Sequence, residues 1–459
     1  MKRIKLGLFL IIVILPIIQG CEHFLDEKAD YSFSTPESLN DLRALLDNEV
    51  IINQGYPGLT EVGNTDYYLD DVELGNIASY LQDTYLWDSN DEATDPSSWV
   101  KPYEAIMVAN VVLESINKVP VSDETLYRQV LGEAHFVRGM FMFYLSQLFC
   151  QPYDENLSTD QLGLPLKYTA NIAEKIERSS LKKTYEQILL DLNTAKDHLP
   201  ERSSYKTRAT KSAAMAGLSR VYLSMAAYDK AERMTDSALL INKELLDYNK
   251  INDQIAFPFK ADNPEIIYQA YSPWTSAILL SSGTFVSDQF YNAFEEDDLR
   301  KALFFTVNAN GKISFKGYYT GFRTSFFAGL SVDELYLNKA ELLARKGMLA
   351  GSLDVLNELR VKRYKSQSYK QLLVAGLNRN EVMNIVLDER RKQLFFRGVR
   401  WMDVRRLNKF DNQGIILRRT SAVTGVLKLY ELKPNDLRFA YPIPKDVVLM
   451  SGLKQNPKQ

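Results

Sequence analysis

Histidine and cysteine are scarce in this chain of 459 residues, which contains three histidines and two cysteines. The histidines, His23, His135 and His198, stand outside any catalytic or metal-binding motif, so a hydrolase triad or a histidine-based metal site has little material. A glycine-rich phosphate loop is also missing. These absences predict a protein that is not an enzyme. A glycoside hydrolase is the least favoured alternative, kept because 58 acidic residues supply chance carboxylate pairs.

An excess of positive charge is also absent, because the chain carries a formal net charge of −3. A mildly acidic body argues against nucleic acid as a partner. A disulfide framework is missing too, because Cys150 has no partner if Cys21 is modified. Stability must then come from a large hydrophobic core, which a chain of this length can bury.

Long hydrophobic runs are confined to the N-terminus. Three basic residues come first, an apolar run follows over residues 6–18, and Gly20 then precedes Cys21. The run is too short to span a bilayer, which takes about 20 apolar residues, and the order is typical of a secretory signal. We therefore expect residues 1–20 to be a lipoprotein signal peptide and Cys21 to be lipidated. An ordinary secretory signal with an incidental cysteine is the alternative.

Helical periodicity dominates the chain beyond this N-terminal segment. Apolar residues recur at intervals of three or four through residues 39–46, 126–148 and 185–195, and again from Tyr103 to Ile116. A chain with this pattern is expected to be mainly α-helical.

Small residues at fixed spacing predict how some of these helices pair. They let two antiparallel helices approach closely, as in tetratricopeptide repeats. One group of small and aromatic residues with this spacing lies between residues 219 and 238. A second group, between residues 340 and 352, repeats part of the same spacing. These positions are Ser219, Tyr222, Ala231 and Ala238, then Ala340, Leu343 and Ser352.

Two stretches, residues 51–99 and 251–330, lack a sustained hydrophobic period and are predicted to be irregular, loop-rich insertions. Few short strands are expected in them, and one of these strands is predicted near residues 265–268. Binding sites commonly sit on loops that a rigid scaffold holds. Exposed aromatic rings there can stack on the C–H faces of a sugar; packing between loops is the alternative role, and a peptide the alternative ligand. The candidate ligand-binding residues are Tyr80, Tyr85, Trp87, Trp274, Tyr318, Tyr319 and Phe322.

Acidic clusters lie in the same two stretches. Loop carboxylates can bind calcium, but neither cluster has the spacing and glycine of an EF-hand loop, so a solvated turn is favoured over a calcium site. The clusters are Asp66, Asp70, Asp71 and Glu73, and residues 295–298.

The most informative segment is the arginine-rich run at residues 388–410, DERRKQLFFRGVRWMDVRRLNKF. It predicts two helices separated by Gly398. Arginine side chains can pair bidentately with the neighbouring carboxylates and stack on Trp401, which would clamp the helices together.

This run closely resembles the C-terminal hallmark of the SusD/RagB family of surface lipoproteins. Further similarity appears at residues 132–138, 185–195, 208–214 and 441–457, so the resemblance covers nearly the whole chain. The hallmark marks the fold rather than the ligand site, and its residues are expected to be structural. They are Glu389, Arg390, Arg397, Gly398, Arg400, Trp401, Asp403, Arg405 and Arg406.

The resemblance implies a tetratricopeptide-like α-helical domain over residues 21–459, with an N-terminal helical part at 21–250 and a C-terminal SusD/RagB part at 251–459. It also implies a lipid-anchored protein of the outer membrane, facing the cell exterior. Such a protein binds an oligosaccharide, or a peptide as RagB-like members would, and delivers it to a SusC-like TonB-dependent transporter. The alternative from another class is a helical-repeat scaffold that binds only proteins.

Overall fold

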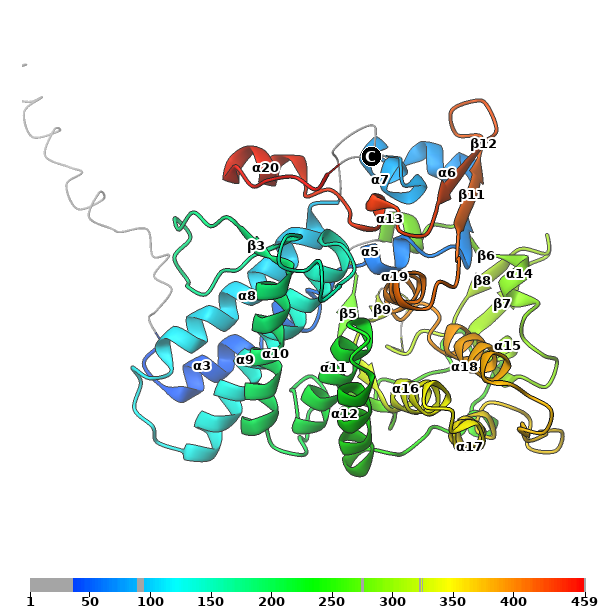
Figure 1. The fold of residues 1–459 in the computed structure, drawn as a ribbon, viewed down its shortest axis with the longest axis horizontal. Coiled ribbons are helices and arrows are strands. Elements are labelled where there is room, and N and C mark those ends of the chain that lie inside the picture. The colour runs from blue at the N-terminus through cyan, green and yellow to red at the C-terminus, as the bar shows by residue number, and fades with distance from the viewer. Residues whose placement is uncertain (1–35, 89–94, 274–275, 322, 324, 458–459) are drawn as a thin grey trace, which may run out of the picture.

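The computed structural model describes residues 36–88, 95–273, 276–321, 323 and 325–457. It is mainly helical, as predicted, with the irregular segments gathered along the top and right of the view in Figure 1. Among these residues, no helix combines the length and the apolar character needed to cross a membrane. The predicted signal peptide and Cys21 lie outside the described residues.

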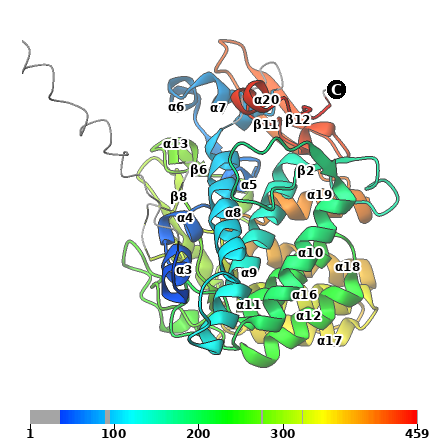
Figure 2. The same cartoon turned by 90° about the vertical axis from the view of Figure 1, so that its left-hand side faces the viewer.

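Most of the main helices pack against their neighbours in sequence: α9 against α8 and α10, α11 against α12, and α16 against α17. Helix α16 also packs against α18. Figure 2 shows α8, α9 and α10 side by side. The helices are α3 (Leu39–Leu46), α8 (Ser97–Ser115), α9 (Glu124–Phe149), α10 (Leu181–His198), α11 (Lys211–Ser224), α12 (Tyr228–Ile241), α16 (Val332–Arg345), α17 (Leu349–Arg360), α18 (Arg379–Gln393) and α19 (Arg400–Phe410).

The irregular stretches contain more short helix than predicted, and α8 begins at Ser97 rather than near Tyr103. Helices of one or two turns carry too few apolar positions to show a period. The short helices are α4 (Glu49–Ile52), α5 (Leu59–Val62), α6 (Asp71–Asn76), α7 (Ser79–Leu86), α13 (Ser276–Leu279), α14 (Asp288–Tyr291), α15 (Leu299–Phe304) and α20 (Lys445–Ser451), with 3₁₀ turns η2 (Tyr248–Lys250) and η3 (Leu437–Phe439).

Strands occur only as antiparallel pairs within the described part of the chain, and β4 confirms the strand predicted near residues 265–268. The pairs are β1 (Tyr67–Leu69) with β6 (Thr284–Val286), β2 (Leu162–Pro165) with β3 (Arg178–Ser180), β4 (Ile266–Tyr268) with β10 (Leu330–Ser331), β5 (Tyr271–Ser272) with β9 (Phe326–Phe327), β7 (Phe305–Val307) with β8 (Ile313–Phe315), and β11 (Leu417–Ser421) with β12 (Lys428–Leu432).

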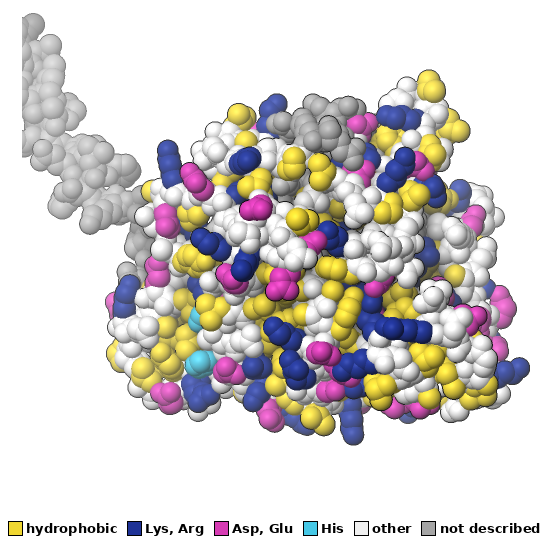
Figure 3. Space-filling view, in the orientation of Figure 1, with side chains coloured by type: hydrophobic (Ala, Val, Ile, Leu, Met, Phe, Trp, Pro, Cys, Tyr) yellow, Lys and Arg dark blue, Asp and Glu magenta, His cyan; other side chains and the backbone are white. Residues whose placement is uncertain are grey.

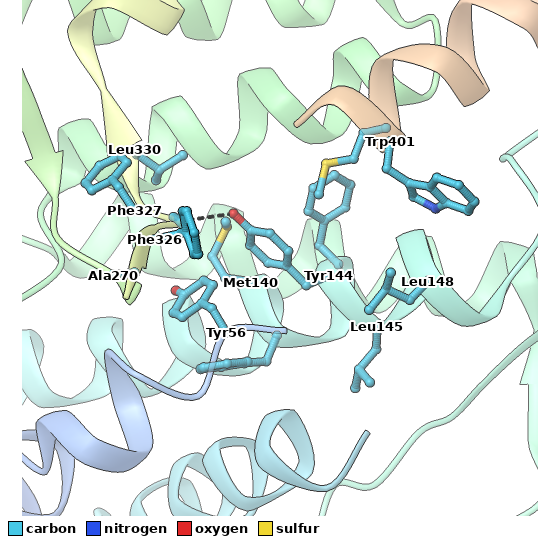
Figure 4. Close-up of a cluster of buried hydrophobic side chains, with 14 of the residues drawn as sticks. Tyr56, Met140, Tyr144, Leu145, Leu148, Ala270, Phe326, Phe327, Leu330 and Trp401 are labelled. Atoms are coloured by element: carbon cyan, nitrogen blue, oxygen red, sulfur yellow. Dashed lines mark hydrogen bonds between the residues drawn. The ribbon is translucent and has the colours of Figure 1, made fainter. Parts of the chain in front are cut away.

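The longest helix, α9, forms the centre of the core. Asp123 caps its N-terminus by accepting from the backbone N–H groups of Thr125 and Leu126. Its C-terminal half is buried on all sides, and Figure 4 shows Tyr144 of this helix among side chains from distant segments. The Tyr144 ring lies 5.0 Å from that of Tyr56, and its hydroxyl donates to the Ala328 carbonyl at 2.7 Å. The helical half and the second insertion therefore share one core.

The helix pairs predicted from small residues are present. Ser219 of α11 and Thr235 of α12 share a hydrogen bond of 2.7 Å between their hydroxyls, and Ser352 of α17 donates to the Ala340 carbonyl of α16 at 2.7 Å. These four side chains are fully buried. Larger residues here would force the helices apart.

A network of buried ion pairs clamps α18 and α19 to the rest of the molecule. Asp403 accepts from Arg390 at 2.7 Å and from Arg406 at 2.9 Å, and Arg406 also pairs with Glu341 of α16 at 2.5 Å. The arginines hold the pKa of Glu341 at about 2 despite its burial. Trp401 is fully buried and stacks on the ring of Tyr441 at 5.0 Å.

Glu389 extends this clamp to two further helices. Its carboxylate pairs with Arg300 of α15 at 2.6 Å and with Arg360 of α17 at 2.5 Å, and all three side chains are buried. Burial alone would raise the pKa of Glu389, but the two arginines hold it at about 2. One carboxylate thus joins three helices.

Glu389→Gln should destabilise the protein by about 3–5 kcal/mol, because it removes the fully buried carboxylate that two buried arginines share. Urea unfolding of the soluble form lacking residues 1–21 measures the change. The neighbouring Asp388→Asn is the matched control, since Asp388 is half exposed and pairs only with Lys392. Equal stability of the two variants would contradict a structural clamp.

Glu61 of α5 is a buried carboxyl group that forms no ion pair with any of the described residues. It accepts from the backbone N–H of Gly398, whose φ of +74° suits glycine, and from the Asn64 amide at 3.4 Å. Burial raises its pKa from 4.5 to about 8, so the group is neutral in the folded protein at pH 7.

The raised pKa makes stability depend on pH. An unfolded chain releases this proton above pH 4.5, so the favourable contribution is complete below pH 4.5 and is lost as pH rises through 8, at about 1.4 kcal/mol per pH unit. Glu61→Gln mimics the neutral form and should flatten the loss between pH 5 and pH 8 in urea unfolding. Glu104→Gln, at a partly exposed site, should not. Parallel pH profiles for wild type and Glu61→Gln would refute the assignment.

Candidate functional site

The two irregular insertions meet in a short antiparallel ladder. β1 pairs with β6, which places Tyr68 opposite Phe285 and Leu69 opposite Thr284, and the Asp70 N–H donates to the Gly283 carbonyl at 3.0 Å. Segments more than two hundred residues apart are thereby joined at one edge of the helical body (Figure 1).

Gly283 allows this close approach. A Cβ atom there would lie 2.5 Å from both the Asp70 carboxylate and Cγ of Glu73. The Glu73 carboxylate accepts from the Ser281 hydroxyl at 2.9 Å and from the Ser282 hydroxyl at 3.4 Å. The loop before β6 is therefore fixed to α6 by hydrogen bonds as well as by the ladder.

A cavity of about 270 Å³ opens beside this junction, between β6, β8 and residues 256–257. Its walls are aromatic. The ring of Tyr318 lies 5.0 Å from Phe315 and 6.2 Å from Phe257, both in edge-on geometry. Tyr318 is deeply placed, whereas Phe257 is 39% exposed. Such a wall offers both apolar faces and an accessible ring.

Polar groups complete the lining. They include the hydroxyls of Ser281, Ser282 and Ser314 and the cations of Lys316 and Arg323, and none of the described lining residues is Asp or Glu. The Lys316 ammonium donates to the Asp253 carbonyl at 2.6 Å, and burial lowers its pKa. The cavity can therefore combine ring stacking with hydrogen bonding, as small polar ligands require.

Three of the predicted ligand-binding aromatics are buried away from this cavity. The Tyr85 hydroxyl accepts from the Leu69 N–H at 2.8 Å, and the Arg419 guanidinium lies over Tyr85 and Trp87, 3.5 and 4.7 Å from the ring centroids. Tyr319 is 1% exposed and lies under the guanidinium of Arg397, 3.3 Å from its centroid. Covered on their faces, these rings pack between loops, which is the alternative role for an aromatic residue in these stretches.

Of the other four predicted aromatic residues, two lie within the described part of the chain. Tyr318 lines the cavity and Tyr80 is half-buried on α7. Trp274 and Phe322 lie outside the described residues. The sequence did not single out Phe257, Phe285 or Phe315, because the strands carrying two of them are only three residues long and show no readable alternation.

The acidic clusters are engaged in other interactions. No group of three or more His, Cys, Asp or Glu side chains within the described residues is placed to hold a metal. Glu73 binds Ser281 and Ser282. The other partners are Asp66 with Arg391, Asp70 with the Glu73 N–H, Asp71 with Ser421 and Ala422, Glu295 with Arg360, Glu296 with Lys301, and Asp298 with Arg300.

Cys150 and the described histidines are engaged in structural contacts. Burial raises the pKa of the Cys150 thiol, which disfavours the reactive thiolate. His135 shares a 2.7 Å hydrogen bond with Asp191, which also binds Arg138, and His198 contacts its own helix at the Thr194 carbonyl. His23 lies outside the described residues.

A helical scaffold that carries an aromatic, partly polar cavity on two joined insertions defines a class of binding proteins. Two family models match this chain: "Starch-binding associating with outer membrane" (SusD-like) over residues 23–223, and "SusD family" (SusD/RagB) over residues 333–458. The chain belongs to the SusD/RagB family. It is thus a SusD-like, non-enzymatic binding protein of the sugar-binding, outer-membrane-associated class.

Known relatives agree in fold. SusD-like protein P38 of Formosa agariphila is 22% identical, over 87% of this chain and 91% of that protein. A putative sugar binding protein from Bacteroides vulgatus matches with a TM-score of 0.75 and 22% identity, over 92% of this chain and 99% of its own. A SusD superfamily protein from Bacteroides thetaiotaomicron matches with a TM-score of 0.73 and 21% identity, over 92% and 100%.

Proposed function

We propose that this protein captures an oligosaccharide in the cavity beside the β1–β6 junction and delivers it to a SusC-like TonB-dependent transporter. The observation that carries the proposal is the aromatic wall of Phe257, Phe315 and Tyr318 facing the hydroxyls of Ser281 and Ser282. Sugar rings present C–H faces that stack on aromatic rings and hydroxyls that exchange hydrogen bonds. Because the serine hydroxyls donate to Glu73, their lone pairs are available to accept from a sugar.

Three alternatives have less support. A groove of about 840 Å³ runs past the end of α12 and along α16, but residues 201–206 and 264–267 form much of it, so it is not a surface of helix pairs alone, as a protein-binding repeat scaffold would offer. A peptide can also enter an aromatic cavity, as a RagB-like function would require. The described lining of the cavity has no carboxylate pair for glycoside hydrolysis.

The anchor and the partner belong to the same proposal. Lipid attached to Cys21 would hold the protein at the outer membrane, facing outward, where a lipid-anchored binding protein would need another protein to move its ligand inward. A β-barrel of the SusC type would serve, with the helical body closing over its mouth as a lid. A lid that survives repeated opening needs a specific interface of at least ~1,200 Å².

Phe257→Ala should weaken oligosaccharide binding about tenfold with little change in stability, because the ring is partly exposed and supplies a stacking face. Ligands are first found by screening the soluble form on glycan and peptide arrays, and affinities are then measured calorimetrically. Tyr205→Ala is the control, an exposed ring on the 840 Å³ groove. A loss of affinity in Tyr205→Ala but not in Phe257→Ala would place the ligand elsewhere.

Mild-detergent purification of the tagged native protein should recover a large outer-membrane barrel in near-equal amount. Cys21→Ala should abolish fatty-acid labelling, release the protein from membranes and reduce recovery of the barrel. Retention of Cys21→Ala in the membrane fraction would argue against the lipid anchor. Recovery of the wild-type protein alone, under conditions that preserve other outer-membrane complexes, would favour a free-standing binder.

A further inference from the structure

We infer that the oligosaccharide taken by this cavity is acidic, with carboxylate or sulfate groups that pair with Lys312, Lys316 and Arg323. This inference rests on the proposed function of the cavity. It concerns the class of sugar, which neither the fold nor the aromatic wall determines.

The three cations have one feature in common: each donates to a neutral oxygen. Lys316 donates to the Asp253 carbonyl at 2.6 Å, Arg323 to the Leu280 carbonyl at 3.3 Å, and Lys312 to the hydroxyl of Tyr68 at 2.8 Å. Among the described residues, no carboxylate forms an ion pair with any of them. The buried arginines around Glu389 and Glu341 pair with acids instead. Buried Arg405 and Arg419 resemble the three cations, since they donate to backbone carbonyls.

The positions of these cations surround the aromatic wall. Lys316 and Arg323 line the cavity itself. Lys312 lies at its rim, where its ammonium is 5.6 Å from the ring centroid of Phe285, a lining residue, and 5.2 Å from that of Tyr68. A sugar stacked on these rings would have positive charge on several sides.

Nearby acids form no ion pair with these cations among the described residues, although Asp253 acts on Lys316 electrostatically. The Glu73 carboxylate is occupied by the hydroxyls of Ser281 and Ser282, and the Asp253 carboxylate accepts from the Gln254 amide at 2.7 Å. Asp70 and Asp288 act on Lys312 only at longer range. The face of the molecule drawn in Figure 3 intermixes basic and acidic side chains.

Desolvation decides between a neutral and an acidic ligand. A bound sugar would displace water from the ammonium of Lys316, whose pKa is already lowered by burial. A neutral sugar offers only hydroxyl acceptors in exchange. A carboxylate or sulfate offers a charge-assisted hydrogen bond, which is about twice as strong as a neutral one. The acidic ligand therefore compensates better for the lost hydration of the ammonium and binds more tightly than a neutral sugar.

The test compares three probes by calorimetry on the soluble form: oligogalacturonates for carboxylates, carrageenan oligosaccharides for sulfate esters, and maltoheptaose as the neutral sugar. We expect at least one acidic probe to bind more tightly than maltoheptaose, and more weakly as salt increases. Lys316→Gln should lower that affinity about tenfold. Lys182→Gln, the same charge change on the exposed surface of α10, should leave it unaltered.

Each other outcome overturns a definite statement. If maltoheptaose binds and neither acidic probe does, the acidic class is wrong while a sugar-binding function stands. If an acidic probe binds equally well to wild type and Lys316→Gln, the cations do not recognise it. If the three probes and the glycan array fail while an acidic peptide binds, both this inference and the proposed sugar function fall.

Discussion

The pairing of buried arginines with buried carboxylates around α18 and α19 is the interaction on which the rest of the structure depends. These ion pairs also involve residues outside α18 and α19. Arg391 pairs with Asp66, immediately before β1, and Glu389 pairs with Arg300, in the helix before β7. One arginine-rich segment thereby fixes the position of both insertions. The same segment contributes Phe396 to the cavity lining, and its ion pairs hold the loops that form the rest of the cavity.

Buried ion pairs are a costly way to join helices, because each charge loses its hydration. Several members meet more than one partner, which offsets part of this cost; Asp403, for example, binds two arginines of the same motif. In return, these pairs fix how the helices are oriented, because a guanidinium and a carboxylate form two hydrogen bonds only in one relative geometry, whereas apolar contacts allow many. Short loops with few apolar residues of their own, such as that of Asp66, need such fixed attachment.

The helical part of the fold was predictable from sequence because long amphipathic helices repeat their pattern many times. The apolar periodicity of residues 126–148 predicted α9, and the spacing of small residues predicted the pairing of α11 with α12. Gly398, with its positive φ, was likewise expected to separate two helices. The β1–β6 junction was not predictable, because strands of three residues carry no period and their partners are far apart in sequence.

The candidate site was predictable only at the level of regions. Both insertions were identified, yet Tyr85 and Trp87 proved to be covered by Arg419, a residue more than three hundred positions away. Whether a ring is exposed depends on such long-range partners, which composition does not reveal. Conversely, Phe257 stands beside a proline in an unremarkable loop, and only the folded chain brings it to Tyr318.

The central claim is that ligand binds where the two insertions meet, on a scaffold that the arginine clamp holds rigid. Amide hydrogen exchange of the soluble protein, with and without saturating oligosaccharide, tests it most directly. The account predicts new protection in residues 278–286 and 313–318, with α11, α12 and the clamp helices unchanged. Protection confined to the helix pairs, with the insertions unaffected, would contradict it.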